Sequence, residues 1–183
     1  MKQILPLLML LGLAFAIHAA EPSFTAPILL TSCGQSADVL MMKTLLTKDS
    51  LTFDYQPQAK PGDLESNRSL IVVVGGSSKG LGAAKVSESE EAARVEALLK
   101  AAKDAGIPVI VAHLGGEARR GELSDNFNRL GANAADHLIV VKGGDNDSLF
   151  TKIAEEKKIL IETAETILAV QPLLHTLYHP SGN

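Results

Sequence analysis

The chain contains three pairs of adjacent glycines, each at or just after the end of a short apolar run. The pairs are Gly75 and Gly76, Gly115 and Gly116, and Gly143 and Gly144, after residues 70–74, 109–112 and 138–141. Apolar runs of this length are typical of strands buried on both faces, as in a parallel sheet covered by helices. Glycine after a strand allows backbone turns that a side chain would forbid. The pattern therefore predicts a parallel sheet whose strands end in glycine-rich loops.

The remaining segments alternate between predicted strands and helices, which favours an α/β fold. Further strands are predicted over residues 28–31, 52–55 and 159–161, and helices over residues 36–48, 87–105, 123–130 and 164–178, with another helix around residues 149–153. We expect a single doubly wound, mostly parallel sheet of five to six strands flanked by helices, flavodoxin-like or Rossmann-like. In the simplest order the second strand lies at one edge and the first and third are central.

Local signals set some helix boundaries. Ser87 and Glu90 have the spacing of a capping box at the start of the most regular helix, and Gly106 followed by Pro108 ends it. Gly131 is expected to close the helix over residues 123–130. Pro172 falls inside the last helical pattern, where it should kink the helix or make it restart.

The first 20 residues resemble a secretory signal peptide. Lys2 provides a positive start, residues 4–17 are apolar, and small residues precede Glu21. The apolar stretch is shorter than the roughly 20 residues of a spanning helix. We expect cleavage after Ala19 or Ala20 and a periplasmic or secreted mature chain without a membrane span. An uncleaved anchor is the alternative. The mature chain, residues 21–183, is predicted to be one domain with its core over about 27–178.

Composition limits the possible functions. The formal net charge is −4 and no basic stripe is visible, so nucleic acid is not expected as a partner. The single cysteine, Cys33, cannot form an intramolecular disulfide. It follows a Leu-Thr-Ser sequence resembling a lipidation box, but residues 21–23 separate it from the apolar segment, which argues against lipidation. We expect no cofactor and no metal site, and no role for His137, His175 or His179.

The sharpest local motif lies in the loop after the third strand, over residues 75–82. Its candidate ligand-binding residues are Gly75, Gly76, Ser77, Ser78 and Lys79. Such a loop can present backbone N–H groups to an anion, or it can be a solvated glycine turn. It resembles the nucleotide-binding turn of short-chain dehydrogenases, but it follows the third strand, and their Tyr-x-x-x-Lys sequence is missing. Residues 80–86 are expected to form a flexible flap.

Two residues are candidates for catalysis. Cys33 lies close to a predicted helix N-terminus, where a thiolate is favoured. His113 ends a predicted strand at the same edge of the sheet and could act as its base. One alternative is that Cys33 is a small buried residue under the loop with no catalytic role. Another is that Cys33 and His113 bind a metal.

Two adjacent arginines in the loop after the fourth strand are candidates for an anion clamp, because a guanidinium binds carboxylates and phosphates through two parallel donors. The candidate residues of this loop are Gly115, Gly116, Arg119 and Arg120, and those of the first loop are Gln35 and Ser36. The alternative is a pair of solvated arginines that bridge the nearby acidic residues Glu117, Glu122 or Asp125.

Three segments taken together resemble one family: residues 31–36, 74–84 and 115–125. It is an uncharacterised family of secreted bacterial proteins, catalogued only as a domain of unknown function. The resemblance covers the mature chain and implies export and a single α/β domain, but no activity.

We therefore expect a domain that binds a small anionic or polar ligand at the carboxyl edge of the sheet, rather than an enzyme. One alternative is a small thiol-dependent or hydrolytic enzyme using Cys33 and His113. The other is a module that docks on a partner protein through the same loops. The residues do not identify the ligand or the partner.

Overall fold

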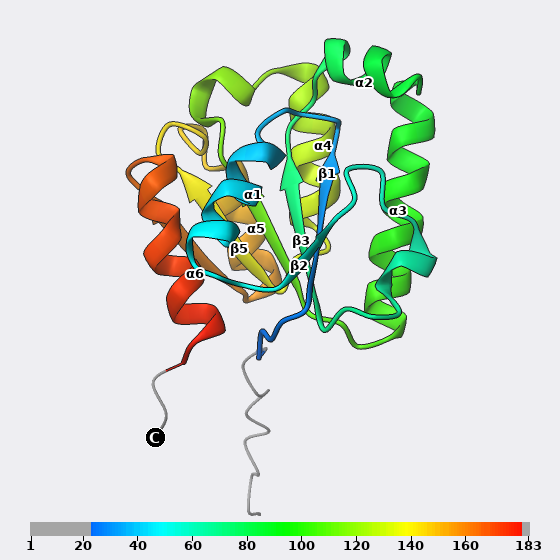
Figure 1. The fold of residues 1–183 in the computed structure, drawn as a ribbon. Helices are drawn as coiled ribbons and strands as arrows, with labels where there is room; N and C mark the ends of the chain where they lie inside the picture. Colours follow the sequence, from blue (N-terminus) through cyan, green and yellow to red (C-terminus); the bar gives the residue numbers. More distant parts are fainter. Residues whose placement is uncertain (1–22, 181–183) are drawn as a thin grey trace, which may run out of the picture.

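The computed structural model describes residues 23–180, and these fold around a six-stranded parallel sheet (Figure 1). The strands are β1 (Ile28–Cys33), β2 (Phe53–Tyr55), β3 (Ser69–Val74), β4 (Val109–His113), β5 (His137–Val141) and β6 (Leu160–Ala164). The α-helices are α1 (Val39–Lys48), α2 (Ser78–Ala84), α3 (Glu88–Asp104), α4 (Glu122–Ala132), α5 (Leu149–Lys157) and α6 (Val170–Tyr178). Three short 3-10 helices are η1 (Pro61–Leu64), η2 (Gly116–Arg119) and η3 (Ile167–Ala169).

The strand order is β2-β1-β3-β4-β5-β6, with every neighbouring pair parallel. This confirms the predicted α/β class and the flavodoxin-like order, with β2 at one edge. Every residue of the four inner strands β1, β3, β4 and β5 is buried. Burial on both faces explains why these strands are continuous apolar runs.

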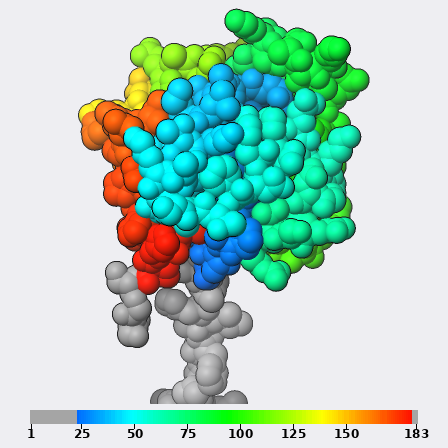
Figure 2. Space-filling model, in the orientation of Figure 1, coloured from blue at the N-terminus to red at the C-terminus, as the bar shows by residue number. Residues whose placement is uncertain are grey.

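Helices cover the two faces of the sheet, and each face has its own apolar core. One core packs α1 and α6 against residues such as Leu30 and Ile71. The other packs α3, α4 and α5 against residues such as Val72 and Val111. In Figures 1 and 2, α1 (cyan) and α6 (orange to red) form one continuous side of the molecule. Neighbouring residues along each strand alternate between the two cores, as the twofold repeat of a strand requires.

Several predicted boundaries are confirmed. Ser87 and Glu90 form the capping box at the start of α3, with Glu90 N–H donating to Ser87 Oγ at 3.2 Å and Ser87 N–H to Glu90 Oε2 at 2.7 Å. The last helix is divided into η3 and α6, but the division falls at residues 169–170 and not at Pro172 as predicted. Pro172 lies in the first turn of α6, where its missing N–H costs no helical hydrogen bond.

Three predictions about helices were wrong. Residues 80–86 are not a flexible flap, because residues 78–84 form α2. Gly131 does not end a helix but lies within α4, where an added Cβ would come 2.4 Å from a Val74 methyl carbon. Close packing of α4 on β3 therefore accounts for this glycine. The segment over residues 164–166 is not helical, since β6 extends to Ala164.

The predicted signal peptide, residues 1–20, lies outside the described residues. Within residues 23–180, no helix is both long enough and apolar enough to span a membrane.

Candidate functional site

The structure brings the predicted loops together at the carboxyl edge of the sheet, where their backbone groups form hydrogen bonds with one another. Gln35 and Gly76 form an isolated antiparallel bridge. The N–H of Gly75 donates to the Cys33 carbonyl at 3.0 Å, and that of Ser77 to the Gly34 carbonyl at 2.9 Å. The loop after β1 and the loop after β3 therefore satisfy each other's backbone groups.

The glycine-rich segment after β3 starts a helix. Ser77 caps α2, since its Oγ accepts the Gly80 N–H at 3.0 Å. An added Cβ on Gly80 would lie 1.9 Å from the Gln35 carbonyl oxygen, so glycine is needed for this close approach. Ser78 and Lys79 are exposed. Of the residues predicted to bind an anion in this loop, these two remain on the surface.

The two adjacent arginines bind carboxylates of the protein itself. Arg119 Nε donates to Asp38 Oδ2 at 3.0 Å. Arg120 donates to both Asp125 (2.7 Å from Nε) and Asp147 (2.8 Å from Nη1 and from Nη2). It also donates to the Gly144 carbonyl at 2.6 Å, which links the loops after β4 and β5. Of the three nearby acidic residues in the alternative, Asp125 pairs with Arg120 as expected, but within residues 23–180 neither Glu117 nor Glu122 pairs with either arginine, and Arg119 binds Asp38 instead.

These ion pairs change the ionisation of the groups involved. The hydrogen bonds that Arg120 donates to Asp147 and Asp125 raise the pKa of its guanidinium. The hydrogen bond from Arg120 holds the pKa of Asp147 well below its usual range. Burial pushes the pKa of Asp125 up, but the hydrogen bond and charge of Arg120 outweigh it and the net shift is downward. The cluster therefore stays fully charged around neutral pH, with its positive charge already matched.

The surroundings of the catalytic candidates are unsuited to a thiolate and a base. Cys33 is the last residue of β1 and is fully buried, and its thiol donates to the Phe127 carbonyl at 3.4 Å. Burial, and then the negative charge of Glu91, raise the pKa of that thiol. Burial lowers the pKa of His113, whose Nε2 lies 3.0 Å from the Gly116 carbonyl. No hydrogen bond joins Cys33 and His113 among the described residues.

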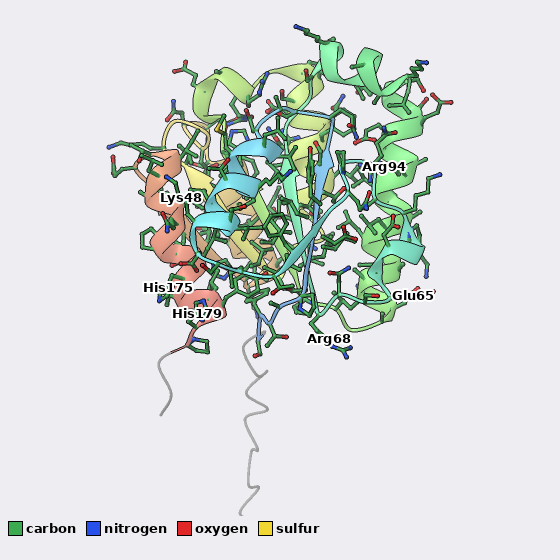
Figure 3. All side chains as sticks on the ribbon, in the orientation of Figure 1. Lys48, Glu65, Arg68, Arg94, His175 and His179 are labelled. Carbon is green, nitrogen blue, oxygen red and sulfur yellow. The ribbon has the colours of Figure 1, made fainter. Side chains whose placement is uncertain are left out.

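Sequence reasoning missed a buried ion pair beneath the loop after β1. Glu91 is fully buried, and Arg94, labelled in Figure 3, has a side chain only 10% exposed. The guanidinium donates to both carboxylate oxygens at 2.8 Å. The carboxylate also accepts from Gly34 N–H and from the Gln35 amide, both at 3.0 Å. The pair therefore holds this loop to α3. Its only sequence signal was the i,i+3 spacing, which many exposed pairs share.

A large hollow lies at the opposite edge of the sheet. It is a cavity of about 940 Å³ between α3, the end of α4 and the starts of β4 and β5. Its floor is apolar and is formed by Leu99, Ile107, Pro108, Val109, Leu130, Ala134, Ala135 and Ile159. Cavities of about 300–1,000 Å³ with apolar walls and a few polar groups are typical small-molecule sites.

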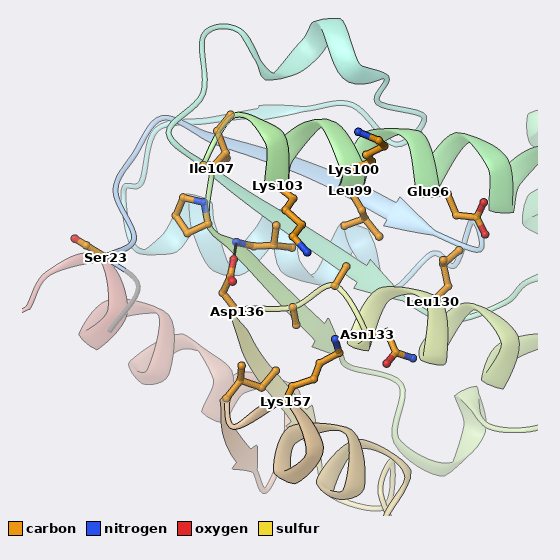
Figure 4. A pocket seen from close by; sticks show the side chains of 16 residues that line it. Ser23, Glu96, Leu99, Lys100, Lys103, Ile107, Leu130, Asn133, Asp136 and Lys157 are labelled. Atoms are coloured by element: carbon orange, nitrogen blue, oxygen red, sulfur yellow. Dashed lines mark hydrogen bonds between the residues drawn. The ribbon is translucent and has the colours of Figure 1, made fainter. Parts of the chain in front are cut away.

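Three lysines line this cavity, of which Lys100 pairs with Asp104, and Glu96 and Asp136 are its two carboxylates. Lys103 on α3 and Lys157 at the end of α5 point toward one another (Figure 4). Within residues 23–180, neither ammonium group has a carboxylate within 4.0 Å. Asp136, at the rim, accepts a hydrogen bond from the Val109 N–H at 2.8 Å, so one of its carboxylate oxygens already has a backbone partner. We call Lys103, Lys157 and the apolar floor the lysine cavity.

Comparison with known families gives one match, which extends over residues 25–178 and so over every element of the sheet. The chain belongs to the family described as Domain of unknown function (DUF6305). The match confirms the resemblance to an uncharacterised family. No curated protein and no solved structure matches the chain.

The DUF6305 domain thus has two regions that can be compared as sites. At the carboxyl edge, the charges of Arg119 and Arg120 are matched by aspartates, and a shallow hollow lies beside Leu114 and Ile167. At the other edge, the lysine cavity places Lys103 and Lys157, which form no ion pair within residues 23–180, beside apolar surface. No family function selects between them.

Proposed function

We propose that this protein is an exported binding domain for a small amphipathic anion, and that the ligand occupies the lysine cavity. The observation that carries the proposal is the placement of Lys103 and Lys157 over an apolar floor. A carboxylate or phosphate between the two ammonium groups would gain charge-assisted hydrogen bonds. An apolar chain of the same molecule would cover Leu99, Ile107 and Ile159.

The carboxyl edge is the less favourable place for the same ligand. An anion there would have to displace Asp38 from Arg119, or Asp125 and Asp147 from Arg120. Displacing these carboxylates returns each of them to water and gains no new charge pair. Lys79 is the exposed positive group that remains in the predicted loop, so it serves as a test of the carboxyl-edge alternative.

The first experiment is thermal unfolding of the purified protein with acetate, octanoate, octyl phosphate and the neutral octanol. A ligand at 100 times its Kd adds about 2.7 kcal/mol of stability, which corresponds to roughly 5–11 °C for a domain of this size. We expect the two long-chain anions to raise the unfolding midpoint, acetate to have little effect, and octanol to act less than octanoate.

Matched lysine variants locate the site. Lys103→Ala combined with Lys157→Ala should weaken octanoate binding at least tenfold, because each charge-assisted hydrogen bond is worth about 1.5–3 kcal/mol. Lys79→Ala removes an exposed lysine at the other edge and should leave the affinity unchanged. Loss of binding in Lys79→Ala alone would place the ligand at the carboxyl edge, and no stabilisation by any anion would reject both sites.

Export is the second part of the proposal and rests on the pattern of residues 1–20. Mass spectrometry of the protein from its producing cells should give a chain that begins at Ala20 or Glu21. A chain that retains its first residues would contradict cleavage.

A further inference from the structure

Three side chains that bear metal-binding atoms meet where α1 and α6 end. Asp49 caps the C-terminus of α1, and His175 and His179 lie in and just after the last turn of α6. The two helices pack side by side on one face of the sheet (Figure 1). Figure 3 shows the two imidazoles beside one another at the end of α6. This cluster is separate from the lysine cavity, with which it shares no residue.

The distances suit a single ion. His175 Nδ1 lies 3.0 Å from Asp49 Oδ1, and His179 Nε2 lies 3.6 Å from Asp49 Oδ2. One ligand atom from each of the three residues lies within 4.8 Å of the other two. Atoms bound to one tetrahedral Zn²⁺ at about 2.0–2.2 Å are themselves roughly 3.3–3.6 Å apart. Small rotations of the two exposed imidazoles would therefore complete a three-ligand site.

The backbone fixes the positions from which these side chains project. The His179 N–H donates to the His175 carbonyl at 2.8 Å, which closes the last turn of α6 and keeps the i,i+4 pair on one side. The Asp49 N–H donates to the Leu45 carbonyl at 3.1 Å, which fixes it at the end of α1. His175 therefore projects from a regular helix, and His179 from the residue that ends it.

The Asp49 carboxylate lacks a partner for one of its oxygens. Its side chain is only 10% exposed, and Oδ2 has no hydrogen bond within residues 23–180. A buried polar atom without a partner costs stability. That oxygen faces His179 at a distance beyond a hydrogen bond, so an ion between them would satisfy it.

Both helices direct their negative ends toward the cluster. The C-terminus of a helix carries a partial negative charge, which favours cations and opposes a carboxylate there. Asp49 is at this unfavourable position at the end of α1, and the last turn of α6 adds a second negative end. A bound cation would offset both the carboxylate and the helix ends.

We propose that Asp49, His175 and His179 bind a divalent transition-metal ion of the zinc type. Two imidazole nitrogens and one carboxylate oxygen are ligands that Zn²⁺ accepts, and three protein ligands leave a fourth position for water or another molecule. The imidazole side chains are 60% and 48% exposed, so that position is accessible from solvent. The ion would also tie the C-terminal helix to α1.

The test is isothermal titration of the protein with Zn²⁺, using protein prepared without a polyhistidine tag and stripped with a chelator. We expect one ion per chain and a rise in the unfolding midpoint. With Co²⁺ in place of Zn²⁺, visible absorption bands should report a site with nitrogen and oxygen ligands. Binding of no ion under these conditions would overturn the proposal.

Variants assign the ligands. Asp49→Asn, His175→Ala and His179→Ala should each weaken Zn²⁺ binding by at least the roughly 10–100-fold that loss of an outer-shell partner costs. The matched control is His137→Gln, which removes a histidine that pairs with Glu162 at 2.7 Å elsewhere in the fold. Zn²⁺ affinity unchanged in the three cluster variants, or lost equally in the control, would reduce the cluster to ordinary ion pairs and overturn the assignment.

Discussion

Glu91→Gln tests whether the buried pair of Glu91 and Arg94 holds the loop after β1. The substitution keeps the shape of the side chain, and its remaining oxygen can still accept from Gly34 and Gln35. In the native protein, Arg94 Nε donates to Glu91 Oε2 at 2.8 Å. The substitution removes the negative charge and puts an amide NH₂ group, which cannot accept this hydrogen bond, in place of that oxygen. The guanidinium, only 10% exposed, is then left without a counter-charge.

The expected cost follows from that burial. Removing one partner of a buried ion pair costs about 3–5 kcal/mol, and roughly 2–4 °C per kcal/mol applies to domains of this size. The unfolding midpoint should therefore fall by about 6–20 °C. Urea unfolding gives the free energy directly, with a slope that should stay unchanged if only stability is altered.

A double-mutant cycle separates charge from packing. Glu91→Met and Arg94→Met together should cost less than the sum of the single changes, because the double variant leaves no buried charge unmatched. Asp104→Asn on the same helix is the control, since its pair with Lys100 is exposed and should contribute about 0–1 kcal/mol. A cost below about 1 kcal/mol for Glu91→Gln, or strict additivity in the cycle, would refute the reasoning.

Three further predictions concern the carboxyl edge. Gly80→Ala should destabilise the fold by about 1–3 kcal/mol, because the added Cβ clashes with a backbone carbonyl. Gly82→Ala places no atom within 4 Å of the added Cβ and should stabilise α2 by about 0.5–1 kcal/mol. Urea unfolding of the two variants measures both changes in stability. The Cys33 thiol should react with a thiol reagent only as fast as the protein opens, and rapid stoichiometric labelling of the native protein would contradict its burial. The aspartates paired with Arg120 have lowered pKa values, so the stability they contribute is present above their unfolded pKa of about 3.9 and is lost as the pH falls through the folded values. Arg120→Ala should therefore flatten the loss of stability in acid, and an unchanged pH profile of the urea midpoint would argue against this.

The architecture could be predicted because its signals are local. The apolar runs that became β3, β4 and β5 have the burial that such runs predict, and the capping box at Ser87 needs only residues within one turn. The helix α2 was missed because two glycines lower its intrinsic propensity. The reason for Gly80 is a contact with the carbonyl of Gln35, far away along the chain.

The sites depend on contacts that no local pattern contains. Arg120 was read as an anion clamp because sequence does not reveal that Asp147, 27 residues later, already binds it. Asp49 and His175 are 126 residues apart and meet only because α1 and α6 share one face of the sheet. The lysine cavity also depends on a contact between distant parts of the chain, because Lys103 is on α3 and Lys157 is at the end of α5.

The strand order has a consequence for how the chain can assemble. In the order β2-β1-β3-β4-β5-β6, every strand after β1 lies beside one that precedes it in the sequence. Each strand after β1 therefore finds a hydrogen-bonding partner already present when it becomes available. A chain that emerges N-terminus first could add its strands outward from β1, so that β6 and α6 complete the fold last. The contact of His175 with Asp49 would then be among the final ones to form.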